Sequence, residues 1–172
     1  MRPNDPPKQA FRTTWNRGRT ALLGALALNL GCAWRGPVSG VVQEAEVGMV
    51  LRGFDGESYP LILDHNAAPL AYLEGCTVRL EGSRMWGTLR VRDWQVTAAA
   101  DGSAPFVGVL RNHGSNLVMD DRNTGSVLVM DGEDLESLRT HEGKLALVVG
   151  YVVGPHVVRV VDYRVLGPEE AP

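Results

Sequence analysis

The sequence predicts an all-β protein made of two related small barrel units in tandem, with one short helix in the second unit. Three observations carry this prediction. Glycine and proline make up 30 of the 172 residues, which favours many turns and short elements. Runs such as Thr77–Glu81 alternate polar and apolar side chains, as half-buried strands do. The chain also repeats parts of itself in order, so a single larger barrel or sandwich formed by both repeats is the alternative.

The internal repeat has three matches at an offset of about 60 to 69 residues, a spacing typical of tandem domains. The third match has the pattern Val-x-Asp-aromatic-x-Val, and the alternation slips at Asp93 and again at Asp162. One extra residue moves the following side chains to the other face, so we expect a β-bulge in each unit. The matches pair Val47–Arg52 with Val107–Arg111, Glu74, Gly75 and Gly82 with Glu142, Gly143 and Gly150, and Val91–Val96 with Val160–Val165.

The second unit is the fuller of the two. We expect a short helix between its third and fourth strands. Asp131 is the expected cap, Leu135 and Leu138 share one face, and Gly143 is the expected stop. The first unit has ten positions from Asp64 to Glu74 where the second has 22 from Asp120 to Glu142, so we expect its third strand and helix to be abridged. The strands expected in the second unit are Phe106–Arg111, Asn116–Asp120, Ser126–Met130, Lys144–Val152 and Val157–Leu166.

Three strands, a short helix and two strands follow the order of the OB-fold, a small Greek-key barrel. Residues 106–166 resemble bacterial OB-type envelope domains, in which Glu-Gly precedes a fourth strand that contains a glycine. We therefore expect a first, abridged OB-like unit over residues 46–97 and a second over 106–166. The turn-rich stretch 98–105 is the expected junction, and 167–172 a tail.

The N-terminal segment differs in charge from the rest of the chain. The whole chain has 17 basic and 20 acidic residues, and the first 31 positions hold five of the basic residues and one of the acidic residues. The remainder therefore has 12 basic and 19 acidic residues and a net charge of −7. A basic stretch ends at Arg19, the apolar run Ala21–Leu30 follows, and small residues flank Cys32. This is the layout of a secretory signal. The run is shorter than the about 20 residues of a membrane-spanning helix.

The sequence Leu30-Gly31-Cys32 resembles the lipobox of bacterial lipoproteins. In that family the cysteine is lipidated and the chain is cut before it. The resemblance implies a signal peptide over residues 1–31, lipidation of Cys32 and a linker over 32–45. It also implies a bacterial cell envelope, with the protein on the outer membrane facing the periplasm. The alternatives are cleavage after Ala33, which gives a secreted protein, and a disulfide between Cys32 and Cys76.

A basic and aromatic patch is the candidate contact surface for a ligand or partner. We expect its arginines to point outward from two paired strands and its tryptophan to lie in the turn between them. OB-type barrels bind ligands by stacking on aromatic side chains and by pairing with arginine. The alternative is a solvated strand face in which Glu81 and Asp93 pair with the arginines. The patch consists of Arg79, Arg84, Trp86, Arg90 and Arg92.

The remaining patterns favour binding over catalysis. The segment after Asp120 lacks a complete calcium loop, the histidines have no metal-ligand spacing, and no nucleophile elbow is present. We therefore expect no catalytic residues, no metal and no cofactor. We expect a lipid-anchored envelope protein with a non-catalytic binding or scaffolding role, whose partner is an envelope protein, glycan or lipid. Two other hypotheses are an OB-fold nucleic-acid-binding protein, which the acidic body argues against, and a small enzyme that uses Asp64, Asp120 or Asp121.

Overall fold

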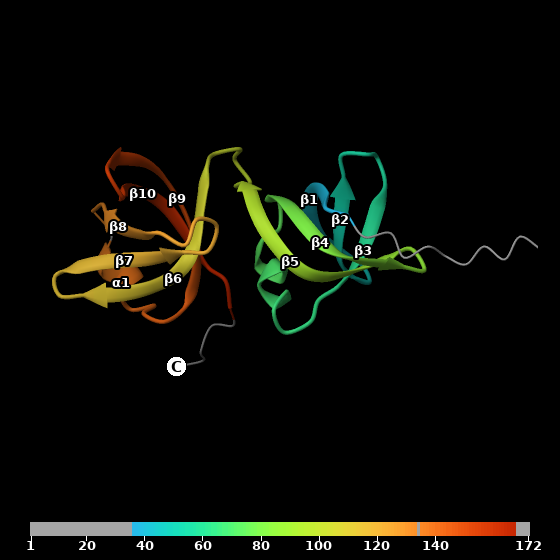
Figure 1. The fold of residues 1–172 in the computed structure, drawn as a ribbon, viewed down its shortest axis with the longest axis horizontal. Coiled ribbons are helices and arrows are strands. Elements are labelled where there is room, and N and C mark those ends of the chain that lie inside the picture. The colour runs from blue at the N-terminus through green and yellow to red at the C-terminus, as the bar shows by residue number, and fades with distance from the viewer. Residues whose placement is uncertain (1–35, 134, 168–172) are drawn as a thin grey trace, which may run out of the picture. The chain divides into compact units, whose positions relative to one another are not determined.

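A computed structural model describes residues 36–133 and 135–167 of the chain. It confirms the all-β architecture and shows two separate closed five-stranded barrels in tandem (Figure 1). The alternative of one larger barrel is therefore wrong. The expected signal peptide, the lipidation site Cys32 and residues 168–172 of the expected tail lie outside the described residues.

The first barrel closes in the order β1-β2-β3-β5-β4, with β1 paired to β4. Strands β3 and β5 pair in parallel, and the other neighbours are antiparallel. Its elements are β1 (Val38–Ala45), β2 (Gly48–Gly53), β3 (Ser58–Ile62), the 3-10 helix η1 (Ala68–Tyr72), β4 (Thr77–Met85) and β5 (Thr88–Ala98).

The second barrel has the same strand order and the same single parallel pair, here between β8 and β10. All five expected strands are confirmed. The expected helix forms over only five residues, and Asp131, its expected cap, is instead the last residue of β8. Its elements are β6 (Pro105–His113), β7 (Asn116–Asp121), β8 (Val127–Asp131), α1 (Leu135–Arg139), β9 (Leu145–Gly154) and β10 (Val157–Val165). Two such barrels in tandem fit a pair of OB-like domains.

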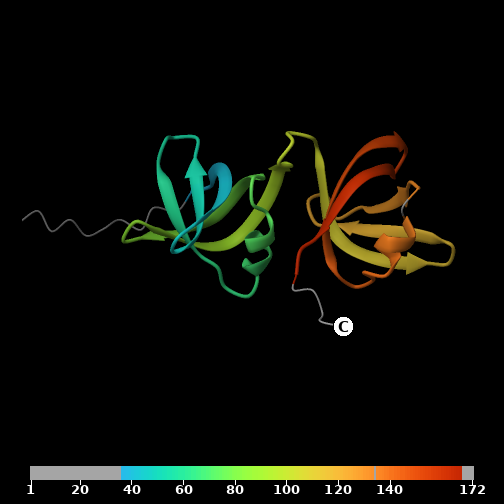
Figure 2. The ribbon, with the colours of Figure 1, turned by 180° about the vertical axis from the view of Figure 1, so that it is seen from behind.

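Apolar side chains fill both barrels, and each short helix adds one buried leucine. Leu70 of η1 packs into the core of the first barrel and Leu138 of α1 into that of the second. Both helices can be followed in Figure 2. Fully buried strand residues include Val42, Leu51, Val78, Leu80 and Val91 in the first barrel and Leu110, Leu117, Met119, Val148 and Val158 in the second. Within the described ranges, no helix is long and apolar enough to cross a bilayer.

The two predicted bulges are confirmed at matched positions. In β5 the register shifts between the pairs Glu81↔Asp93 and Gly82↔Val91, so Arg92 is the extra residue. In β10 it shifts between Val149↔Asp162 and Gly150↔Val160, so Val161 is the extra residue. After the first bulge, the side chains of Trp94 and Val96 are the ones that point into the core.

Strand β1 corrects the expected domain organisation. It occupies residues 38–45, which we expected to belong to a linker over 32–45. Val38 and Val42 do alternate into the core, but Ser39 and Gly40 between them hide the strand pattern. The first barrel thus begins before residue 46 and has a complete third strand, β3. Only its helix is reduced, to a single 3-10 turn.

The first of the three repeat matches is also out of register. Val47–Arg52 runs into β2, the second strand of its barrel, whereas Val107–Arg111 lies in β6, the first strand of the other. Gly40 of β1 is the true counterpart of Gly108 in β6. A Cβ at Gly40 would lie 2.2 Å from the carbonyl oxygen of Arg52, and one at Gly108 would lie 2.2 Å from that of Asp120.

Candidate functional site

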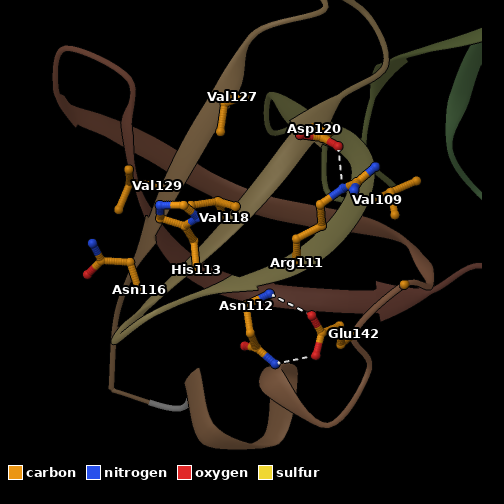
Figure 3. Close-up of a pocket in the computed structure, with 11 residues that line it drawn as sticks. Val109, Arg111, Asn112, His113, Asn116, Val118, Asp120, Val127, Val129 and Glu142 are labelled. Atoms are coloured by element: carbon orange, nitrogen blue, oxygen red, sulfur yellow. Dashed lines mark hydrogen bonds and ion pairs between the residues drawn. The ribbon is translucent and has the colours of Figure 1, made fainter.

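The outward face of β6, β7 and β8 is hollowed into an open pocket of about 890 Å³ (Figure 3). The strand register places Val109, Asp120 and Val127 in one row across the sheet. Arg111, Val118 and Val129 form the next row. We call the four valines Val109, Val118, Val127 and Val129 the valine face.

The valine face exists because β7 and β8 have apolar side chains at outward positions as well as at inward ones. Leu117 and Met119 of β7 point into the core, and Val118 between them points outward. In β8, Leu128 and Met130 are buried, while 53% of Val127 is exposed. An antiparallel sheet with one solvated face normally carries polar residues there. Outward valines on three neighbouring strands are therefore a feature that packing inside this barrel does not require.

Paired polar side chains border the valines. Arg111 Nε lies 2.6 Å from Asp120 Oδ2, so an ion pair crosses the face. The backbone N–H of Asn112 donates to Glu142 Oε1 at 3.2 Å and its Nδ2 donates to Oε2 at 2.9 Å. These hydrogen bonds lower the pKa of Glu142 below its usual range. His113 and Asn116 close one end of the hollow (Figure 3).

This arrangement is suited to binding. Glu142, with its lowered pKa, stays ionised at neutral pH and acts as a fixed hydrogen-bond acceptor rather than as a general acid. The valines offer apolar area, and the ion pair offers one donor and one acceptor at a defined place. Concave, mostly apolar surfaces with a few placed polar groups are the usual form of ligand sites. Among the described residues, no group of three or more His, Cys, Asp or Glu side chains could hold a metal ion.

The predicted basic and aromatic patch is spread over the β4–β5 hairpin. Arg79 lies opposite Gln95, and Arg90 lies opposite Ser83, four positions further along β4. Trp86 occupies the turn at the end of the hairpin, as expected.

The other two arginines of the patch have different surroundings. Arg84 NH2 lies 2.6 Å from Glu57 Oε2, and its guanidinium stacks 4.6 Å from the ring centroid of Tyr59. Arg92 is the bulge residue and lines a shallow pocket with Glu81 and Asp93. The structure thus joins Arg84 to the hairpin tip but separates Arg79 from it, and a binding role for the patch stays a prediction.

The three carboxylates of the enzyme hypothesis all have structural hydrogen bonds or ion pairs. Asp64 accepts from the N–H groups of Asn66 and Ala67 in a turn. Asp121 is buried and accepts from the backbone N–H of Thr124 at 3.0 Å. Asp120 pairs with Arg111. Asp64 belongs to the first barrel and the other two to the second.

Sequence reasoning missed the valine face. The available signal was the run Leu117-Val118-Met119 and, in the next strand, Val127-Leu128-Val129-Met130. Both runs are apolar in each phase, which is unusual for an antiparallel sheet that is solvated on one side. We interpreted them only as strands, because the strand pattern alone does not say which phase faces out.

The fold and this face together define a tandem OB-like barrel protein with a hollowed outer surface on its second barrel. Among solved structures, the chain is similar to the crystal structure of the tetrameric p202 HIN2 at 13% identity and a TM-score of 0.29. That similarity covers 78% of this chain and 96% of the other. A TM-score this low supports no inference about function. No protein-family model and no curated protein matches the sequence.

Proposed function

We propose that the chain is a lipid-anchored bacterial envelope protein that binds a protein partner through the valine face and catalyses no reaction. The anchoring is inferred from the basic head, the apolar run and Cys32. The binding role is inferred from the hollowed outer face of the second barrel. Anchoring at the outer membrane, facing the periplasm, would confine the valine face to envelope partners.

The valine face is the observation that carries this proposal. Exposed apolar side chains gain free energy when a partner covers them, and covering a half-exposed valine contributes roughly 1 kcal/mol. Val127 is the half-exposed member and the other three valines are less exposed, so covering the valine face contributes on the order of 2 kcal/mol before any polar contact is counted. The ion pair of Arg111 and Asp120 would orient the partner, because only one placement matches its donor and acceptor.

A protein is the partner class that the lining favours. No Phe, Tyr or Trp side chain is among the eleven residues that line the hollow. Single-stranded nucleic acids bind OB-like barrels through bases that stack on aromatic side chains and through a positive groove. The hollow has His113 as its only aromatic ring among these eleven residues, and its one arginine, Arg111, is already paired with Asp120. Branched aliphatic side chains instead suit the apolar side chains of another protein.

Site-specific photo-crosslinking in the native host tests the proposal. A benzophenone amino acid replaces Val127 in the valine face, and a matched variant carries it at Val47, an exposed valine in the β1–β2 turn of the first barrel. We expect one discrete protein adduct from position 127 and none from position 47. Equal labelling at the two positions, or no adduct at position 127, would contradict the proposed binding face.

A further inference from the structure

The β4–β5 hairpin of the first barrel ends in exposed apolar side chains. Met85 is 64% exposed and Trp86 is 94% exposed. Trp86 has a φ of 55° and Gly87 a φ of 78°, a pair of values for which tight hairpin turns prefer Asn-Gly or Asp-Gly. A bulky side chain at positive φ is strained. Both the exposure and the backbone therefore disfavour tryptophan here in the isolated protein.

The β2–β3 turn, which contains another exposed aromatic side chain, is joined to this hairpin through Arg84. Phe54, 69% exposed, lies in the turn between β2 and β3. Arg84 of the hairpin forms its 2.6 Å ion pair with Glu57 of that turn and stacks on Tyr59 just after it. We call Met85 and Trp86 the apolar tip. The contacts of Arg84 fix the hairpin against the β2–β3 turn, so the apolar tip is a preformed feature of the first barrel.

The chain enters the first barrel at the same end. Strands β1 and β4 are antiparallel and pair Val38 with Leu80, so β4 continues past the start of β1 as far as Met85. Gly36 and Pro37 line a shallow pocket together with Glu81 of β4. The five residues by which β4 overshoots span about 17 Å at the rise of a β-strand.

The chain between Cys32 and Val38 can be as long as the part of β4 that extends past the start of β1. The six steps of chain from Cys32 to Val38 can span at most about 21 Å. A lipid on Cys32 would therefore hold this end of the first barrel close to the bilayer surface. It would also allow Cys32 and Trp86 to lie at the same depth.

We propose that the apolar tip inserts into the interface of the leaflet that holds the lipid on Cys32, so that the first barrel has two attachments to the membrane. This inference rests on the lipid anchoring proposed above. Tryptophan is enriched at the interface between lipid and water, because its ring is apolar while its N–H can reach water or headgroups. One lipid chain gives only reversible attachment, and a second signal stabilises it.

Headgroup charge contributes little to this contact. Arg84, Arg90 and Arg92 lie in the same hairpin as Glu81 and Asp93, and Glu57 pairs with Arg84. Acidic side chains, with Asp55 of the β2–β3 turn included, therefore offset the basic ones around this end of the barrel. We expect insertion by apolar contact, with quenching that changes less than about twofold when anionic lipid is removed, in contrast to a polybasic segment.

Tryptophan quenching by brominated lipids tests the inference. The mature lipidated protein is reconstituted into vesicles of brominated phosphatidylethanolamine and phosphatidylglycerol. After removal of the signal peptide it contains Trp34, Trp86 and Trp94, of which Trp94 is buried. Because Trp34 lies two residues from the lipid and would itself be quenched, the comparison is made in the Trp34→Phe background. We expect bromolipid quenching in Trp34→Phe and a several-fold smaller quenching when Trp86→Phe is added. Equal quenching of these two variants would overturn the inference.

Two further observations separate the possible failures. Flotation of the protein with the vesicles reports the anchor independently of Trp86. Flotation without Trp86 quenching overturns the insertion of the apolar tip and leaves the anchoring proposal standing, whereas failure to float overturns both. A benzophenone at Met85 that captures a protein in cells, with no quenching in vesicles, would assign the apolar tip to a protein partner instead.

Discussion

At the residue scale, Tyr59 shows how one hydroxyl group responds to its surroundings. The hydroxyl donates a hydrogen bond to the carboxylate of Asp55, four positions earlier in the chain. This bond favours the protonated phenol and the ionised carboxylate, so it raises the pKa of Tyr59 to about 12 and lowers the pKa of Asp55. Burial of the Tyr59 ring acts in the same direction on the phenol.

The titration of Tyr59 yields a prediction with a definite sign. An unfolded tyrosine ionises near pH 10, so between about pH 10 and 12 only the folded chain keeps this proton, and the stability that it contributes is lost as the pH rises through that window. Asp55→Asn removes the main cause and should lower the pKa of Tyr59 toward 10. Tyrosinate absorbance, taken as the difference from Tyr59→Phe, measures the midpoint. An unchanged midpoint in Asp55→Asn would show that Asp55 is not the cause.

At the scale of elements, the glycines opposite the two bulges have the same role. A Cβ at Gly82 would lie 2.1 Å from the carbonyl oxygen of Arg90, and one at Gly150 would lie 2.2 Å from that of Arg159. Strands β4 and β9 therefore approach β5 and β10 too closely for any side chain at these positions. The same close approach occurs at Gly40 and Gly108, where the strand register has no shift, so it is not peculiar to the bulges.

Substitution of Gly150 tests this account of the hairpin. Gly150→Ala should lower the free energy of unfolding by about 1–3 kcal/mol, the usual cost of overpacking. Gly154→Ala, in the same strand, is the control, because a Cβ there meets only the side chain of Val157 at 3.8 Å. Urea denaturation measures both. If the two variants lose the same stability, close approach to the Arg159 carbonyl is not the reason for the glycine.

The sequence predicted the second barrel better than the first for a physical reason. Strands β6 to β10 are separated by glycine and polar turns, and their buried positions hold large aliphatic residues such as Leu110 and Met119. Strand β1 instead pairs closely with β2 through Gly40, a residue that has no side chain to reveal an inward position. Strand β6 has Gly108 at the matching position, but its large neighbours Phe106 and Leu110 still mark it as a strand, whereas β1 has only valines at the corresponding positions.

The candidate site was less predictable than the fold. The sequence placed Trp86 correctly in a hairpin turn, because Met85-Trp86-Gly87 lies between two alternating runs. It did not reveal that Phe54 lies in a turn joined to this hairpin, since the Arg84–Glu57 pair spans 27 positions. It also did not reveal the valine face, which depends on the register of three strands.

At the scale of the whole molecule, the intact mass of the protein purified from its native host with detergent tests the export argument. We expect the mass of Cys32–Pro172 plus acyl chains. A chain that starts at Trp34 would instead indicate a secreted protein. An uncleaved chain would restore the nucleic-acid hypothesis, although a net charge of −7 beyond residue 31 opposes phosphate binding.

A count of reactive thiols in the same preparation is an independent check. Cys76 is buried, and burial raises the pKa of its thiol, so we expect no reaction with a thiol reagent in the folded protein. After denaturation, one reactive thiol agrees with lipid on Cys32 or with a chain that starts at Trp34, and the intact mass separates these two. Two thiols would show that Cys32 is unmodified, and none would indicate a disulfide with Cys76.

The closure of each barrel has a consequence for the order of events during synthesis. In the first barrel, β1 pairs with β4 and β3 pairs with β5, so neither seam can form until the last strands have left the ribosome. Pairings between distant parts of a chain form slowly, because a long loop must close before any contact is gained. A nascent chain of this topology remains open for longer than a helical one of the same length. We propose that this protein is exported. The delay in folding would keep the chain unfolded, and so able to pass through a translocation channel, until the signal has been recognised.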